Sequence, residues 1–245
     1  MTTLRQALLA TARRMNREGI NQGTSGNLSV RARPGFLITP SGLAYDRCRA
    51  ADMVPMTFDG GWTGTKRPSS EWRIHRDVMA DRPEVGGVLH AHSTHATALA
   101  CLGKGIPAFH YMVAVANGPD IRCAPYATFG TEALSRHVLK ALAGRKACLM
   151  ANHGMLVLGA DLDDALARAI EVEKLAEMYL KALQGGRPKI LGAAEMRVVL
   201  DKFKDYGRNA QQAAMPATGK AARAHGGAKK PTAPVAGRKA RPKRA

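Results

Sequence analysis

Apolar and polar positions follow two different periods along this chain. Residues 3–18 place apolar side chains at helical spacing and are followed by Gly19, so the pattern predicts a helix that stops there. Residues 27–33 and 35–39 instead alternate between apolar and polar, with Pro34 and Gly35 between them. That pattern is typical of a β-hairpin.

The same criteria predict the other elements. Helices are expected over residues 71–81 (with Ser70 as N-cap), 94–102, 131–143, 161–184 (with Asp161 as cap) and 191–206. Strands are expected over residues 86–92, 107–112, 121–126, 147–151 and 156–159. Because strands and helices interleave without a strict βαβ repeat, the pattern favours a layered mixed α/β domain over a parallel doubly wound sheet.

Composition places the chain among ordinary globular proteins. It has 245 residues, of which 45% are hydrophobic, and no apolar run approaches the length of a membrane span. The first residues lack the apolar segment and cleavage site of a secretory signal. We therefore expect a cytoplasmic protein without a membrane partner.

The net charge of +18 is unevenly distributed. From Gln211 onward there are nine Lys and Arg residues, no acidic residue and no aromatic residue. Such a segment has little to bury, so we predict a folded domain over residues 1–210 and a disordered basic tail over residues 211–245. A tail of this kind can bind nucleic acid, but we favour a solvated appendage and do not expect nucleic acid as a partner.

The four cysteines, Cys48, Cys101, Cys123 and Cys148, form no C-x-x-C motif. Scattered cysteines without dense spacing are typical of a reducing compartment. We expect them to be buried thiols, neither disulfide-bonded nor zinc ligands.

A pair of histidines carries the clearest chemical signal. His90 and His92 lie two residues apart at the end of a predicted strand, so their side chains project from the same face. A catalytic zinc site needs a third protein ligand and an open position. His153, which follows a buried strand and sits between Asn152 and Gly154, is the best candidate. His75, His95, His110, His137 and His225 are taken as ordinary surface or supporting residues.

Glu71 lies at the predicted start of a helix, directly after Ser69 and Ser70. Its position is explained equally well by the helix dipole and by a role as a base. The two serines and two other small-residue turns, residues 23–27 and 39–42, offer hydroxyl groups and backbone N–H groups that could together hold a phosphate. The chain has no Walker-type or G-x-G-x-x-G nucleotide motif.

Six segments, in one order and spacing, resemble the class II aldolase/adducin family. They are GTSGNLS at 23–29, TPSG at 39–42, SSEWRIH at 69–75, VLHAHSTHATAL at 88–99, CAPYATFGT at 123–131 and NHG at 152–154. PAFHYM at 107–112 and DKFKDYG at 201–207 make the chain most similar to the L-fuculose-1-phosphate aldolases of that family. The resemblance covers about residues 3–207 and leaves the tail out.

The resemblance implies an α/β fold, a three-layer α/β/α sandwich with a central mixed, mainly antiparallel sheet. It also implies a homotetramer with active sites between neighbouring subunits. One Zn²⁺ per subunit would be bound by His90, His92 and His153, although ligand type alone does not separate zinc from Mn²⁺ or Co²⁺. Glu71 would be a fourth metal ligand and the acid/base. The substrate phosphate would be held by Gly26, Asn27, Ser41, Gly42, Ser69 and Ser70.

Three aromatic residues complete the site that the resemblance implies. Tyr111 would act from the adjacent subunit, and Phe129 and Tyr206 would line the aldehyde side. The expected reaction is reversible cleavage of a ketose 1-phosphate into dihydroxyacetone phosphate and a small aldehyde, through a zinc-stabilised enediolate. The sugar would be L-fuculose 1-phosphate or a 5-deoxy- or 5-methylthioribulose 1-phosphate. Methylthioribulose-1-phosphate dehydratase and ribulose-phosphate 4-epimerase, from the same family, are the alternatives.

Overall fold

A seven-stranded sheet forms the centre of the protein. The computed structural model describes residues 3–204, and the strand order across the sheet is β3-β2-β1-β4-β7-β6-β5. Every neighbouring pair is antiparallel except β5 and β6, which are parallel. The strands are β1 (Asn27–Arg31), β2 (Phe36–Ile38), β3 (Val54–Met56), β4 (Gly87–Ala91), β5 (Arg122–Ala124), β6 (Ala147–Met150) and β7 (Gly154–Gly159).

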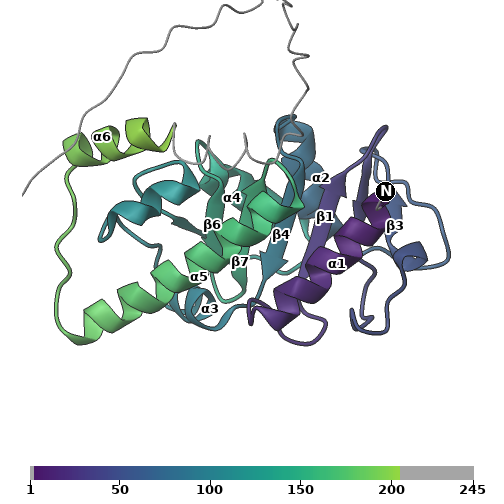
Figure 1. Ribbon diagram of the computed structural model, residues 1–245, viewed down its shortest axis with the longest axis horizontal. Coiled ribbons are helices and arrows are strands. Elements are labelled where there is room, and N and C mark those ends of the chain that lie inside the picture. The colour runs from purple at the N-terminus through teal and green to yellow at the C-terminus, as the bar shows by residue number, and fades with distance from the viewer. Residues whose placement is uncertain (1–2, 205–245) are drawn as a thin grey trace, which may run out of the picture. The chain divides into compact units, whose positions relative to one another are not determined.

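Helices cover both faces of this sheet (Figure 1). One face packs against α1 (Leu4–Arg17), α3 (Thr94–Cys101) and α5 (Leu162–Gln184), and the other against α2 (Trp72–Asp81) and α4 (Glu132–Leu142). The predicted three-layer α/β/α arrangement is thus confirmed. The 3₁₀ helices η1 (Ala50–Asp52) and η2 (Tyr111–Ala116) lie in connecting segments, and α6 (Ala193–Phe203) packs on η2.

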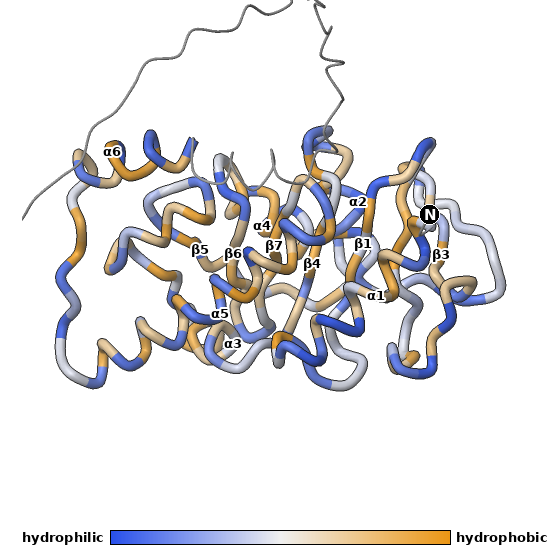
Figure 2. The backbone as a smooth tube through the Cα atoms, viewed as in Figure 1, coloured by the Kyte–Doolittle hydropathy of each residue, from blue (hydrophilic) through white to orange (hydrophobic). Residues whose placement is uncertain are grey.

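Two hydrophobic cores, one on each face, follow from the alternation of side chains along the strands. In β4, Leu89 and Ala91 join the core under α1, α3 and α5, while Val88 joins the core under α2 and α4. His90 therefore points to the α2 side of the sheet. Figure 2 shows hydrophilic and hydrophobic colours alternating along α1 and α5, as expected for helices with one buried face.

Most predicted elements are confirmed, with ends that differ by a few residues. Thr3 and Gln6 form a capping box at α1, and the side chains of Thr131 and Asp161 cap α4 and α5. The hairpin of β1 and β2 is present, with Arg31 paired to Phe36. The short strand β3 was not predicted.

Three expectations are wrong. Residues 107–112 are not a strand. Ile106 forms a single bridge with Ile121, and the next residue, Pro107, has no N–H to donate to a neighbouring strand. The chain turns there and enters η2. Ser70 does not cap α2, since Glu71 occupies that position and no side chain bonds the first turn. All four cysteines are free thiols, but only Cys48 and Cys148 are buried: Cys101 is exposed at the end of α3, and Cys123 is half-buried.

Tyr206 and the predicted basic tail lie outside the described residues. Within residues 3–204, no helix is both long and apolar enough to cross a membrane.

Candidate metal centre

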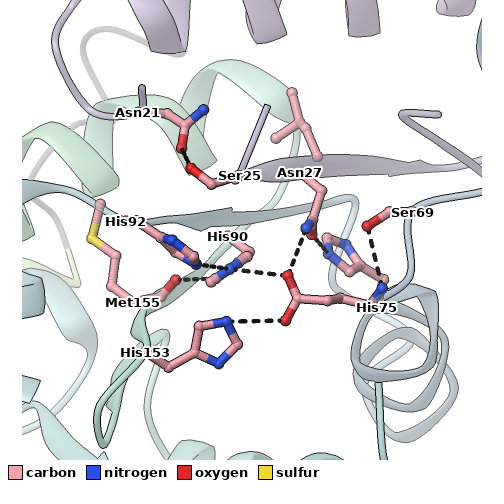
Figure 3. A network of polar contacts seen from close by, with 12 residues as sticks. Asn21, Ser25, Asn27, Ser69, His75, His90, His92, His153 and Met155 are labelled. Carbon is pink, nitrogen blue, oxygen red and sulfur yellow. Dashed lines mark hydrogen bonds and ion pairs between the residues drawn. The ribbon is translucent and has the colours of Figure 1, made fainter. Parts of the chain in front are cut away.

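Three histidines meet at one end of the sheet. His90, His92 and His153 each offer a ring nitrogen, and these nitrogens all lie within 4.8 Å of one another. The three rings stand nearly edge to face, with centroids 4.8–5.0 Å apart. Figure 3 shows the three rings facing a common centre. The predicted cluster is therefore present.

Strand geometry and one tight turn bring these rings together. His90 lies in β4 and His92 just beyond its end, so the period of two puts both on one face. His153 lies in the turn between β6 and β7, where Asn152 has a left-handed backbone (φ 53°). A side chain at Gly154 would come within 2.5 Å of the Ala91 carbonyl oxygen, so only glycine lets this turn approach β4.

A backbone carbonyl orients the His90 ring. The His90 Nδ1 lies 2.9 Å from the carbonyl oxygen of Met155 on the neighbouring strand β7. Because a carbonyl only accepts, Nδ1 donates its proton and Nε2 points into the cluster. Metal-binding histidines are commonly held in this way.

The Glu71 carboxylate closes the cluster from the α2 side. Its Oε2 lies 3.1 Å from His90 Nε2, and its Oε1 lies 3.2 Å from His153 Nε2. Glu71 is only 5% exposed. As the N-cap residue of α2, it makes no side-chain bond to the helix and instead contacts the histidines. The structure thus favours a role in the site over a role in stabilising the helix dipole.

The charges of the cluster are strongly coupled. Burial alone would raise the pKa of Glu71, but the neighbouring His90 and His153 outweigh it and hold that pKa well below its usual range. Burial also opposes charge on His90, yet Glu71 raises the pKa of His90 above its usual value. Burial and the other two histidines lower the pKa of His92 to about 4. The Glu71 carboxylate is therefore ionised, and because a buried negative charge is unfavourable, it requires a positive charge close by to be stable.

A divalent metal fits this donor set. Three imidazoles and one carboxylate are ligands that zinc and similar transition metals accept. Glu71 Oε1 is buried without a hydrogen-bond donor apart from its ion pair with His153. A cation among the three rings would satisfy that oxygen and neutralise the carboxylate.

A second polar chain lies behind Glu71, and the sequence did not reveal it. Asn27 Nδ2 donates to Glu71 Oε2 at 2.9 Å, and Asn27 Oδ1 lies 2.5 Å from His75 Nε2. Ser29 Oγ lies 2.7 Å from His75 Nδ1. His75 is fully buried, and burial lowers its pKa to about 3. The only sequence signal was its spacing of four residues from Glu71, one turn along the helix.

The predicted phosphate-binding segments are brought together by backbone hydrogen bonds. The Thr39 N–H donates to the Leu28 carbonyl, and the Ser69 N–H donates to the Thr39 carbonyl. Pro40 and Pro68 form an isolated bridge beside them. Among the six predicted residues, Gly26, Asn27 and Ser69 are buried, whereas Ser41, Gly42 and Ser70 are exposed.

The aromatic residues predicted for the site, Phe129 and Tyr111, are exposed, unlike the buried phosphate-binding candidates Gly26, Asn27 and Ser69. Phe129 is exposed in the loop before α4, and its neighbour Gly130 lies against the Ser70 carbonyl, where a side chain would come within 2.9 Å. Tyr111 is about half exposed at the start of η2, and its ring packs on His110. Tyr206 lies beyond the described residues, which end at Lys204.

Comparison with known protein families shows to which family this chain belongs. Residues 6–180 match the family described as "Class II Aldolase and Adducin N-terminal domain". The chain belongs to the class II aldolase/adducin family. This aldolase-family chain carries the metal-capable histidine triad, as a metal-dependent family requires.

Individual relatives agree with the family assignment. A 5-methylthioribulose-1-phosphate/5-deoxyribulose-1-phosphate aldolase of Rhodospirillum rubrum is 56% identical over 214 residues, which cover 87% of this chain and 97% of that protein. An L-fuculose phosphate aldolase of Escherichia coli K12 is 46% identical, with 83% of this chain and 95% of that protein covered. The solved structure of an L-fuculose 1-phosphate aldolase superposes with a TM-score of 0.79 at 40% identity, covering 82% of this chain and 96% of that one.

Proposed function

We propose that this class II aldolase cleaves a ketose 1-phosphate between C3 and C4, reversibly, into dihydroxyacetone phosphate and a small aldehyde. The observation that carries the proposal is the convergence of His90, His92 and His153 with the ionised Glu71 carboxylate. The arrangement offers ligands for a metal and a base within one cluster, in which His90 and Glu71 are buried and His92 and His153 are partly exposed. The aldolase names of the relatives identify a reaction that needs both.

The preferred substrates are 5-methylthioribulose 1-phosphate and 5-deoxyribulose 1-phosphate. These are the sugars in the name of the Rhodospirillum rubrum relative, which is 56% identical to this chain. L-Fuculose 1-phosphate is the sugar in the name of a relative at 46% identity and is kept as a further substrate.

A Zn²⁺ ion held by the three histidines would supply Lewis-acid stabilisation of the negative charge that forms next to the substrate carbonyl. The rest of the chemistry belongs to the protein. When the C3–C4 bond breaks, its electron pair remains on C3, and the C4 hydroxyl must lose its proton as the aldehyde forms. Glu71, ionised before the substrate binds, takes up a proton from solvent and delivers it to C3; in the reverse direction it removes that proton from dihydroxyacetone phosphate.

Other residues bind and orient the substrate. Gly26, Asn27 and Ser69, with the exposed Ser41, Gly42 and Ser70, hold the phosphate through backbone N–H groups and hydroxyls. Phe129 borders these segments and lines the aldehyde side, together with Tyr206. Tyr111 relays the C4 hydroxyl proton to solvent in the site of a neighbouring subunit, releasing its own phenol proton as it accepts this one. Its exposed position supports that role.

The proposal also covers the domain bounds, the assembly and the cellular location of the protein. The aldolase domain extends over residues 1–210, it assembles as a homotetramer in the cytoplasm, and residues 211–245 form an appended basic tail. The exposed position of Tyr111 supports an active site shared between subunits.

A substrate panel tests the reaction. The full-length protein loaded with Zn²⁺ is incubated with the three ketose 1-phosphates, and release of dihydroxyacetone phosphate is followed with a coupled dehydrogenase. We expect release from at least one of them. An epimerase or a dehydratase would consume its sugar phosphate without releasing dihydroxyacetone phosphate, and that result would overturn the proposal.

A further inference from the structure

A buried hydrogen-bonded chain runs from β1 to the candidate base. It consists of Ser29, His75, Asn27 and Glu71, with distances of 2.7, 2.5 and 2.9 Å between successive partners. Asn27 and Ser29 lie on the same face of β1, since they are two residues apart, and His75 reaches them from α2. Figure 3 shows Asn27 beside the His75 ring, and the Asn27 amide also contacts the Glu71 carboxylate.

The direction of each hydrogen bond is dictated by chemistry. An ionised carboxylate only accepts, so the Asn27 side chain must turn its NH₂ group toward Glu71. Its carbonyl oxygen then faces His75 Nε2, which must carry the ring proton. A neutral ring has one donor, so His75 Nδ1 accepts, and Ser29 supplies the hydroxyl proton. All three bonds therefore donate toward Glu71.

Without the His75 donor, the Asn27 side chain would lose its directional constraint. A rotated amide would set its oxygen against the Glu71 oxygen, and two acceptors repel each other in a buried site. Asn27 is 4% exposed, so water gives little compensation. The backbone of Asn27 is already held, because it pairs with His90 between β1 and β4.

We infer that His75, set by Ser29, is a positioning residue that holds the Asn27 amide as a donor to Glu71 and thereby fixes the orientation of the base. The inference rests on the proposed function for Glu71. With Oε2 held by Asn27, Oε1 is the oxygen that faces the metal cluster without a hydrogen-bond donor of its own. Oε1 is then the oxygen that exchanges a proton with the substrate.

Paired substitutions separate positioning from packing. In His75→Gln the amide nitrogen stands where Nε2 stood, so the donor to Asn27 is kept. In His75→Asn the shorter side chain reaches only the position of Nδ1, so contact with Ser29 is kept and the donor is lost. His137→Gln makes the same chemical change on α4, where the ring bonds the Pro125 carbonyl, and serves as the matched control.

For the zinc-loaded protein, we expect His75→Asn to lower kcat and the exchange of the C3 proton of dihydroxyacetone phosphate by about 10- to 100-fold, the range found when groups supporting a metal site are removed. KM should change less than kcat, and zinc content should stay at the wild-type value. His75→Gln and His137→Gln should retain wild-type kcat within about threefold, a difference below 1 kcal/mol. Equal losses in His75→Gln and His75→Asn, or wild-type rates in both, would overturn the inference.

A measurement without substrate keeps the inference testable if no ketose 1-phosphate is cleaved or if a variant fails to fold. Nitrogen-15 NMR of the wild-type protein identifies which His75 nitrogen carries the proton. We expect Nε2 to be protonated in the wild type and the preference to weaken in Ser29→Ala. Protonation on Nδ1 in the wild type would contradict the chain of donors, whatever the protein's activity.

Discussion

The two oxygens of Glu71 experience different surroundings. Oε2 accepts from Asn27 and lies 3.1 Å from His90, whereas Oε1 faces only His153 at 3.2 Å. In the absence of a metal, these neighbours hold the pKa of Glu71 well below its usual range. If a substrate displaced the carboxylate from a metal held by the three histidines, Glu71 would leave part of this positive charge, and its pKa would move up toward the value that an acid/base requires.

Glu71→Gln removes the base while keeping the shape of the side chain. We expect zinc to be retained by the three histidines and the exchange of the C3 proton of dihydroxyacetone phosphate with D₂O to fall by about 10²- to 10⁴-fold, as for loss of a general base. Deuterium incorporation and elemental analysis measure the two effects. Exchange at the wild-type rate would remove Glu71 from its assigned role.

His92→Ala removes one of the three candidate metal ligands. Because a two-histidine site binds transition metals much more weakly, metal and activity should be lost together. Zinc content by elemental analysis and turnover are measured on the same sample, with His137→Ala as the control that retains both. Full zinc occupancy in His92→Ala would show that the ion binds elsewhere.

Burial of His75 also makes stability depend on pH. Its pKa is about 3 in the folded protein and 6.5 in the reference state, so below pH 6.5 the unfolded chain binds a proton that the folded chain does not. Stability therefore falls as the pH falls, by up to about 1.4 kcal/mol per pH unit for this group. Urea unfolding of wild type and His75→Gln between pH 6.5 and 5 should show the steeper decline in wild type; parallel curves would contradict it.

At the scale of elements, α3 begins directly after His90 and His92, two of the candidate metal ligands. Its first turn is held by Glu173 of α5, whose carboxylate accepts from the N–H groups of His95 and Ala96 at 2.8 and 2.9 Å. Although burial alone would raise the pKa of Glu173, these bonds and one from Ser93 lower it. Glu173 thus fixes where β4 ends and α3 begins.

Glu173→Ala should lower the free energy of unfolding by about 1–3 kcal/mol, because two partly buried N–H groups at the start of α3 lose their acceptor. Denaturant unfolding measures this loss, and Glu171→Ala, two residues earlier on α5, is the matched control. Equal stabilities of the two variants would show that Glu173 does not hold α3.

The elements differ in how well their patterns predicted them. α4 and α5 have caps and helical apolar spacing in the chain itself, so local interactions determine their starts at Thr131 and Asp161. Residues 107–112 look like a strand by composition, but a strand needs a partner, and only Ile106 finds one. β3 is only three residues long, which is too short for an alternation of apolar and polar residues to be recognised in the sequence.

At the scale of the whole molecule, the basic tail lies outside the family match, which ends at residue 180. We expect deletion of residues 211–245 to leave kcat/KM within about twofold, because the metal cluster and phosphate segments all lie before residue 154. Turnover measures this, and binding of the intact protein to DNA at several salt concentrations tests whether the tail alone binds phosphate backbones. A loss of turnover on deletion would give the tail a part in the enzyme.

The sequence by itself determined the family and the layered α/β class. It also determined which three histidines could bind a metal, because their convergence depends on local spacing: two residues in a strand, or a turn after a buried strand. Tertiary structure alone decided how Glu71 is used, since its partners His90 and His153 come from other elements. It alone also revealed the chain from Ser29 through His75 and Asn27. The sequence separation of these residues does not indicate contact, because β1 and α2 come together only when α2 packs on the face of the folded sheet.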